Sequence, residues 1–257
     1  MSATSVTWWG HSTVWLADSG ITLLTDPVLT DRVAHLRRLA GPTPTLPGAP
    51  DAVLLSHLHA DHFHLASLRL LAGAPTLIVP RGARAFVAKT LGSEWASRCV
   101  ELAPGEDTKV GPLRVRAVPA AHDGARGPWS RDRALAVGFV VEGAARTWYA
   151  GDTGLFDGMT EIGPLDLALI PVGGWGPTLG SHHHLDAADG AEALRRVKSG
   201  WAVPIHYGTL WPIGMTRFRT HMFDQPGGRF AELAARSSPG TRVRVLAQGE
   251  TLAVERG

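Results

Sequence analysis

The chain has 257 residues, of which 44% are hydrophobic and 19% are charged, as in an ordinary soluble globular fold. The formal net charge of +2 is too small to indicate a nucleic-acid partner, and a single cysteine, Cys99, excludes an intramolecular disulfide. No apolar run reaches membrane-spanning length, and the N-terminus lacks a basic region followed by an apolar core. We therefore expect a cytoplasmic protein with no membrane span.

In chain order, the first third predicts short strands and then helices that alternate with strands. The first strands are expected at Val6–Trp9, Ser12–Ala17 and Ile21–Leu24, with a hairpin turn at Asp18–Gly20. A loop rich in Pro and Gly follows at Gly41–Pro50. After the loop we expect a buried strand at Ala52–Leu55, a helix at Phe63–Ala72, a strand at Thr76–Val79 and a helix at Arg81–Leu91.

The rest of the chain is β-rich at first and mixed towards its end. Strands are predicted at Leu113–Pro119, Ala134–Glu142, Thr147–Ala150 and Leu165–Pro171. We then expect a helix at Asp186–Val197, a strand at Trp201–Ile205, a helix at Gly228–Ala235 and a final hairpin of Thr241–Leu246 and Thr251–Val254. No change in composition marks a linker, so the sequence predicts one α/β domain over residues 1–257, with sheet inside and helices outside.

The most informative segment, Ser56-His-Leu-His-Ala-Asp-His62, directly follows a predicted buried strand. Imidazoles and a carboxylate this close together suit a borderline divalent ion such as zinc. Residues two apart on an extended backbone point the same way, so His57 and His59 can share one ion. Asp61 and His62 fall where the chain turns into a helix and can serve a second ion. The density of the pattern disfavours the alternative, a polar loop of unconnected side chains.

Three further candidates, His122, Asp152 and His206, each follow a predicted strand. Taken singly, each of them reads as an ordinary core or surface residue. Taken together they repeat one arrangement, and in layered α/β folds sites collect where strands end. Two ions need about seven protein ligands and a shared water, and a carboxylate such as Asp152 can bridge two cations.

This combination resembles the metallo-β-lactamase superfamily, which is marked by His-x-His-x-Asp-His, a later His, a later Asp and a final His. The resemblance covers the chain from Trp9 to His206. It implies an α/β fold of the four-layer αββα sandwich type, with mixed sheets, helices outside and a dinuclear site at one edge. It also implies which residues hold each ion: one ion by His57, His59 and His122, the other by Asp61, His62 and His206, with Asp152 as the bridge.

Finer features resemble one branch of that superfamily, which contains ascorbate-6-phosphate lactonase and the phospholipase D that hydrolyses N-acylphosphatidylethanolamine. They lie in Trp9–Leu16, Leu24–Val28 and Asp166–Gly173. His184 stands in the position of the branch's His-x-Asp-Pro-Glu-Glu segment, although Ala187 replaces its Pro, which would loosen the start of the next helix. The diiron branch has Glu where this chain has His59, so hydrolytic chemistry is favoured over dioxygen chemistry.

We therefore expect a metal-dependent hydrolase in which a hydroxide bridging two divalent ions attacks a phosphodiester or a phosphorylated lactone. Zn²⁺ suits the ligand set, and Mn²⁺, Fe²⁺ or Co²⁺ would fit the same shell. Asp61 is expected to orient the nucleophile or accept its proton, and His184 to contact the substrate or protonate the leaving group. The alternatives are a lactonase or thioesterase acting on a neutral acyl substrate and a non-catalytic metal-binding protein. The expected partner is a small-molecule substrate; homo-oligomers occur in the branch, and the sequence leaves the oligomeric state open.

Other residues near these motifs allow two interpretations each. His11 either supports a metal ligand or lies in a turn, and Asp26 either hydrogen-bonds to a metal-binding histidine or caps a turn. The segment Asp31–Arg38 predicts a solvated helix face, the alternative being an overhang whose Arg32, Arg37 or Arg38 binds a phosphate. Trp175 is a candidate for the wall of the substrate pocket.

Overall fold

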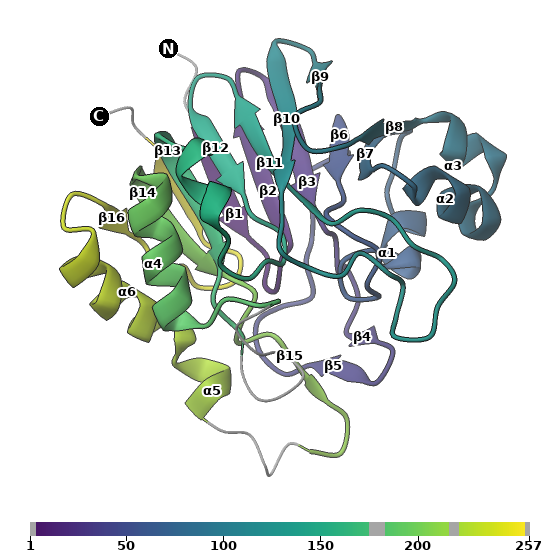
Figure 1. The fold of residues 1–257 in the computed structure, drawn as a ribbon. Coiled ribbons are helices and arrows are strands. Elements are labelled where there is room, and N and C mark those ends of the chain that lie inside the picture. Colours follow the sequence, from purple (N-terminus) through teal and green to yellow (C-terminus); the bar gives the residue numbers. More distant parts are fainter. Residues whose placement is uncertain (1–3, 175–182, 216–220, 255–257) are drawn as a thin grey trace.

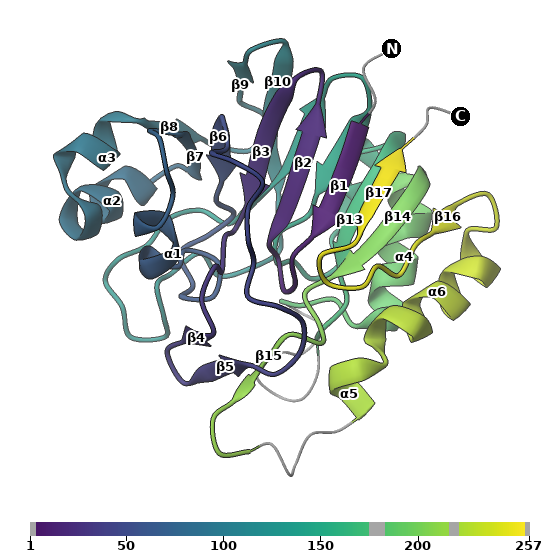
Figure 2. The same ribbon diagram turned by 180° about the vertical axis from the view of Figure 1, so that it is seen from behind.

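The computed structural model describes residues 4–174, 183–215 and 221–254, which form two large sheets with helices on their outer sides (Figures 1 and 2). Trp175 lies outside the described residues. Among the described residues, no helix is long and apolar enough to cross a membrane.

The first large sheet is built mainly from the N-terminal third of the chain. Its strand order is β17-β1-β2-β3-β6-β7-β8. The strands are β1 Thr4–Trp8, β2 Val14–Asp18, β3 Ile21–Thr25, β6 Ala52–Leu54, β7 Thr76–Pro80, β8 Cys99–Leu102 and β17 Thr251–Val254. β2 pairs antiparallel with β1 and β3, and β3 pairs parallel with β6, so β1, β3 and β6 all run in the same direction.

The second large sheet has the order β16-β14-β13-β12-β11-β10-β9. Its strands are β9 Asp107–Val110, β10 Leu113–Pro119, β11 Val137–Glu142, β12 Arg146–Tyr149, β13 Leu165–Pro171, β14 Ser199–Ile205 and β16 Arg242–Val243. β11 pairs antiparallel with β10 and with β12, and the pairs β12–β13 and β13–β14 are parallel. Consequently β10, β12, β13 and β14 share one direction, and their carboxyl ends meet at one edge.

Central strands such as β6, β11 and β13 are buried on two faces, which explains their nearly continuous apolar runs. In β11, Phe139 and Val141 pack in the core between the sheets, whereas Val140 points to the core under the outer helices. In β6, Leu54 faces the inter-sheet core and Val53 the opposite one. Successive strand residues point to opposite faces, so each strand supplies two cores at once.

Helices cover the outer face of each sheet and complete four layers. On the first sheet lie α1 Leu65–Arg69, α2 Ala83–Leu91 and α3 Ser93–Ser97. On the second lie η1 Asp157–Glu161, α4 Ala187–Val197 and α6 Pro226–Ser237, and α5 His221–Asp224 precedes α6 (Figure 1). The Asp186 side chain accepts hydrogen bonds from the N–H groups of Ala188 and Asp189, so α4 has a well-formed N-terminal cap despite Ala187. The expected αββα sandwich is confirmed.

The structure corrects three predictions of secondary structure. Thr241–Leu246 and Thr251–Val254 do not form a hairpin, because β16 pairs with β14 in one sheet and β17 pairs with β1 in the other. The helix expected at Phe63–Ala72 is shorter than predicted. It is α1, Leu65–Arg69, which begins after His64 because His64 has an extended backbone and is the N-terminal cap. The segment Asp31–Arg38 contains β4 Arg32–Val33 and β5 Leu36–Arg38, which form a small sheet with β15 Leu210–Pro212 instead of a helix.

Candidate metal centre

The predicted ligands all leave the carboxyl ends of strands that run in the same direction within their sheet. In the first sheet, Asp26 follows β3 and the segment from His57 to His62 follows β6. In the second sheet, His122, Asp152 and His206 follow β10, β12 and β14. The two edges meet directly, because the N–H of His206 donates to the carbonyl oxygen of His11, which follows β1, at 2.9 Å. The topology therefore brings residues far apart in sequence to one place.

The first group consists of His57, His59 and His122, whose ligand atoms lie within 4.8 Å of one another. His59 Nδ1 is 2.9 Å from His57 Nε2 and 3.1 Å from His122 Nε2. The outer nitrogens of two of these rings are held by the protein: His57 Nδ1 lies 2.9 Å from Ser56 Oγ, and His122 Nδ1 lies 2.8 Å from the carbonyl oxygen of His183. The three inner nitrogens therefore face a common point.

The second group contains Asp61, His62 and His206 together with His11. The Nε2 atoms of His62 and His206 are 3.2 Å apart, and His62 Nε2 is 3.9 Å from Asp61 Oδ2. His11 Nε2 lies 3.1 Å from that same carboxylate oxygen, and its ring lies 4.1 Å from the ring of His206 between centroids. Of the two interpretations of His11, the structure favours support of a candidate ligand.

Asp152 lies between the two groups. Its Oδ2 is 3.1 Å from His62 Nε2, and its Oδ1 is 3.1 Å from His206 Nε2. It also forms a third group with His122 and His184, in which His184 Nε2 lies 3.5 Å from Asp152 Oδ2. His184 is thus close to the predicted ligands, whereas the side chain of His183 is exposed.

The donor set fits divalent cations. Only one member of a pair of facing imidazole nitrogens can donate a hydrogen, so three nitrogens pointing at one another leave unsatisfied lone pairs that a cation would satisfy. Asp152 Oδ1 is buried and has no well-formed hydrogen bond among the described residues, although His206 Nε2 lies 3.1 Å away. A buried carboxylate oxygen without a well-formed hydrogen bond is costly unless it faces a cation. The clusters of His and Asp are therefore suited to metal ions.

Burial and neighbouring charges set the protonation of these groups. Burial lowers the pKa of His122 to about 4, and burial together with neighbouring histidines lowers the pKa of His57 well below its usual value. Burial would also lower the pKa of His62, but Asp152 and Asp61 raise it well above the ordinary value. Burial raises the pKa of a carboxyl group, yet His206 and His62 hold the pKa of Asp152 well below its usual range. The histidines of the first group are therefore neutral at pH 7, whereas the second group is an ion-paired cluster.

Asp26 holds one candidate ligand in place from behind. Its side chain is 0% exposed, and its Oδ2 accepts hydrogen bonds from His62 Nδ1 at 2.7 Å, Ser56 Oγ at 2.5 Å and Tyr149 Oη at 2.5 Å. The N–H of Ser56 donates to Oδ1 at 2.8 Å. A carboxylate that accepts from Nδ1 leaves Nε2 of His62 free to act as a ligand. This resolves the role of Asp26; the roles of Ser56 and Tyr149 had no signal in the sequence.

Backbone strain accompanies the site. His11, Asp26 and His206 have φ angles of 49°, 30° and 62°, in the left-handed region that residues other than glycine rarely adopt. Each lies where a strand ends and the chain turns sharply into the site. Such conformations persist where the surrounding hydrogen bonds fix them, and they concentrate at functional sites.

Two other features are not part of this centre. Arg38, a candidate for phosphate binding, is buried and donates to the carbonyl oxygens of Trp9 and Val28, so its guanidinium group supports the fold.

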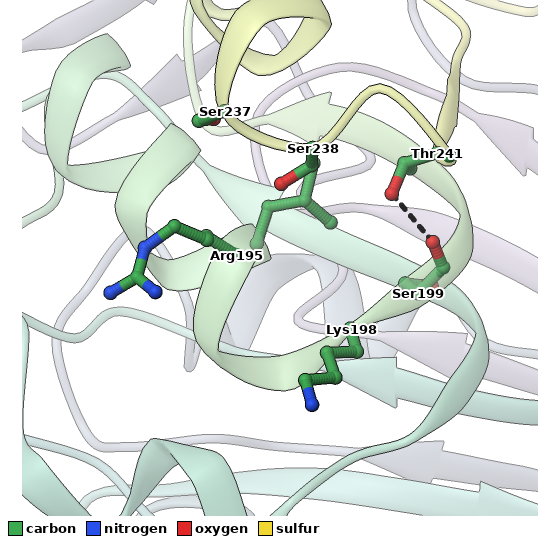
Figure 3. A pocket seen from close by; sticks show the side chains of 8 residues that line it. Arg195, Lys198, Ser199, Ser237, Ser238 and Thr241 are labelled. Atoms are coloured by element: carbon green, nitrogen blue, oxygen red, sulfur yellow. Dashed lines mark hydrogen bonds between the residues drawn. The ribbon is translucent and has the colours of Figure 1, made fainter.

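A surface hollow of about 390 Å³ lies beside Lys198 and Ser199, where Thr241 is hydrogen-bonded to Ser199 (Figure 3). Ser199 begins β14, whereas His206 follows its end, so the hollow lies at the opposite edge of the sheet.

Comparison with known proteins identifies the family. The family described as the Beta-lactamase superfamily domain matches residues 22–207. The N-acyl-phosphatidylethanolamine-hydrolyzing phospholipase D 1 of Caenorhabditis elegans is 30% identical, over 82% of this chain and 65% of its own length. A UPF0173 metal-dependent hydrolase of Thermoplasma acidophilum is also 30% identical, over 82% of this chain and 86% of its own. The solved structure of Igni18, a metallo hydrolase from Ignicoccus hospitalis, has a TM-score of 0.75 at 22% identity, covering 99% of this chain and 100% of that one.

The chain therefore belongs to the beta-lactamase superfamily. Within it, the protein is a metal-dependent hydrolase with clusters of His and Asp side chains suited to metal ions. The expected superfamily, fold and enzyme class are confirmed.

Proposed function

We propose that the protein is a dinuclear hydrolase, acting as one domain, whose metal ligands are the seven residues predicted from the sequence. One ion would be held by His57, His59 and His122 and the other by Asp61, His62 and His206. Asp152 would bridge them. The observation that carries the proposal is the position of Asp152, whose two oxygens each lie 3.1 Å from a histidine of the second group while the same side chain clusters with His122 of the first.

When bound, two such ions would lower the pKa of a shared water and polarise the group it attacks. The side chains around them would then position the reactants. Asp61 has a pKa well below its usual value, because His62 and His11 outweigh the effect of burial, so it is a carboxylate at neutral pH. The hydrogen bond from His11 occupies its Oδ2 atom. Asp61 is thereby fixed in one orientation, in which it can orient the nucleophile or accept its proton.

His184 is the proposed substrate-contacting residue. Its Nε2 lies 3.5 Å from Asp152 Oδ2, and its Nδ1 is buried with no hydrogen-bond partner among the described residues. A ring whose Nε2 lies beside a candidate metal centre can contact the substrate or donate a proton to the leaving group through that nitrogen. This assignment agrees with the position of His184 in the branch motif noted above.

We propose a phosphodiester or a phosphorylated lactone as the substrate and Zn²⁺ as the preferred metal. The named activity of the Caenorhabditis elegans relative, cleavage of a phosphodiester lipid, supports the first substrate class. The predominance of imidazole ligands supports zinc, although Mn²⁺ and Fe²⁺ accept the same set.

The test is turnover of bis-p-nitrophenyl phosphate by zinc-loaded protein, compared with the variants Asp61→Asn and His184→Ala. His35→Ala is the matched control, because the side chain of His35 is exposed and lies outside the candidate metal groups. We expect a loss of kcat of about 10²- to 10⁴-fold in both site variants and little change in the control. Turnover of lactones or thioesters without phosphodiesters would favour the neutral acyl alternative. Absence of turnover with all three classes would favour a non-catalytic metal-binding protein.

A further inference from the structure

Arg126 contacts the backbone of the segment that carries three of the seven proposed ligands. Its Nη1 atom donates to the carbonyl oxygen of Leu58 at 2.9 Å and to that of Phe63 at 2.8 Å. These two carbonyl groups bracket residues 59–62, which include His59, Asp61 and His62. One nitrogen atom therefore ties together both ends of the stretch.

The bracketed stretch has little regular structure of its own. Its internal backbone hydrogen bonds run from the N–H groups of His62 and Phe63 to the carbonyl oxygen of His59, at 3.1 and 2.8 Å. The carbonyl groups of Leu58 and Phe63 lie outside this turn and are bound by Arg126. Hydrogen bonds from a charged donor contribute more than neutral ones, so the guanidinium group is a substantial constraint on the turn.

Arg126 is itself held in place by the loop between β10 and β11, which also carries His122. The backbone N–H of Arg126 donates to the carbonyl oxygen of Asp132 at 3.0 Å, and Ala125 forms a bridge with Arg133. The guanidinium group stacks over the ring of Phe86 in α2, 5.2 Å from its centroid. The side chain is thus fixed at both ends and connects segments from the two sheets.

We propose that Arg126 is a positioning residue for the metal centre: it fixes the backbone of residues 59–62 so that their side chains meet His122 and Asp152. This rests on the proposed function. Arg126 does not touch the reacting atoms. It acts through the carbonyl groups of Leu58 and Phe63, and among the described residues no hydrogen bond or ion pair joins it to a proposed ligand side chain.

A positioning role and a purely electrostatic role of Arg126 predict opposite changes in metal affinity when its side chain is removed. A cation near a metal centre repels a second cation, and Arg126 lies within electrostatic reach of the site, because Asp61 partly offsets the lowering of the pKa of Arg126 by burial. If the charge of Arg126 were its main effect, its removal would tighten metal binding. If Arg126 positions the ligands, its removal weakens metal binding, because the ligands lose their preorganised geometry.

The experiment measures zinc dissociation constants by competition with a chromophoric chelator, for full-length wild type, Arg126→Ala, Arg126→Lys and the control Arg131→Ala. Arg131 is an exposed arginine of the same loop. We expect Arg126→Ala to bind zinc about tenfold more weakly and Arg131→Ala to match wild type. Lysine can donate to both carbonyl groups from one nitrogen, so Arg126→Lys should recover part of the loss. Arg126→Gln replaces the alanine variant if circular dichroism shows that the latter does not fold.

The ligand-field spectrum of cobalt-substituted protein gives a second readout, which should change in Arg126→Ala and not in Arg131→Ala. Unchanged or tighter zinc binding by Arg126→Ala, with an unchanged cobalt spectrum, would overturn the proposal. Failure of wild type to bind zinc or cobalt would instead refute the dinuclear site, so the two failures are distinguishable.

Discussion

Replacing Asp26 by Asn should separate metal binding from folding. Asp26 Oδ2 accepts from His62 Nδ1 at 2.7 Å, and the Nε2 atom of that ring points at Asp152. An amide nitrogen placed at Oδ2 donates, so Nδ1 of His62 must become the acceptor and the ring proton moves to Nε2. A protonated Nε2 has no lone pair for a metal ion. Ser56 Oγ and Tyr149 Oη also contact this oxygen, but hydroxyl groups can reverse their roles.

The magnitudes follow from these contacts. We expect Asp26→Asn to weaken metal binding about 10- to 100-fold, the usual cost of losing such a partner, with a modest loss of stability. Asp26→Ala removes the acceptor entirely and leaves two buried donors, His62 Nδ1 and the N–H of Ser56, without a hydrogen-bond partner. At about 1–3 kcal/mol for each stranded donor, the free energy of unfolding of the metal-free protein should fall by about 2–6 kcal/mol.

Asp18→Asn is the matched control. Asp18 is 2% exposed and accepts four hydrogen bonds, from Thr4, Ser19, Ala144 and Ala145, at the end of β2. It should lose stability while binding metal as wild type does. The assays are urea unfolding of metal-free protein and chelator competition for zinc. Zinc binding by Asp26→Asn at wild-type affinity, or an equal loss in Asp18→Asn, would refute the reasoning.

Three further outcomes are expected. Because burial lowers the pKa of His57, His59 and His122 while Asp152 and Asp61 raise that of His62, filling the first position at pH 7 should release almost no protons. Metal binding at the second position should release the proton of His62, and the number of protons released should fall as pH rises through the raised pKa of His62. Calorimetry in buffers of different ionisation enthalpy measures the protons released at each position. Equal release from the two positions would contradict the assignment. Gly151→Ala should weaken zinc binding, because the new Cβ would lie 2.7 Å from Ser56 Cβ. It should also lower the free energy of unfolding by more than the strain of a left-handed residue at φ +63°, which alone costs about 1–2 kcal/mol. Gly20→Ala, at φ +79° with nothing within 4 Å, should show the strain alone in the same unfolding assay. Removal of metal with a chelator should abolish hydrolysis and lower the melting temperature, with zinc restoring both; activity that survives complete removal would exclude metal-dependent chemistry.

The elements that the sequence predicted well are those with a simple hydrophobic period. Leu113–Pro119 and Leu165–Pro171 are strands with the predicted bounds, because the first alternates apolar and polar residues and the second is an almost continuous apolar run buried on both faces. The final hairpin was wrong because strand pairing is a non-local property. Thr241–Leu246 and Thr251–Val254 have the composition of neighbouring strands, and only the packing of the whole chain sends β16 and β17 to different sheets.

The candidate ligands were predictable because each is a His or Asp placed directly after a strand. The side chains that support them were predictable only in part. Asp26 and His11 stood at strand ends and were open alternatives, whereas Tyr149 is the last residue of β12 and Arg126 lies in an irregular loop. No local pattern marks a tyrosine or an arginine whose partners are far away in the sequence: Asp26 lies 123 residues from Tyr149, and Leu58 lies 68 residues from Arg126. Such partners are defined by the tertiary structure alone.

Crystals of zinc-loaded protein would test whether the seven proposed ligands hold two metal ions, with anomalous scattering recorded on both sides of the zinc absorption edge. We expect two anomalous peaks per chain, one among His57, His59 and His122 and one among Asp61, His62 and His206, with Asp152 touching both. A single peak, or metal bound away from these residues, would contradict this expectation.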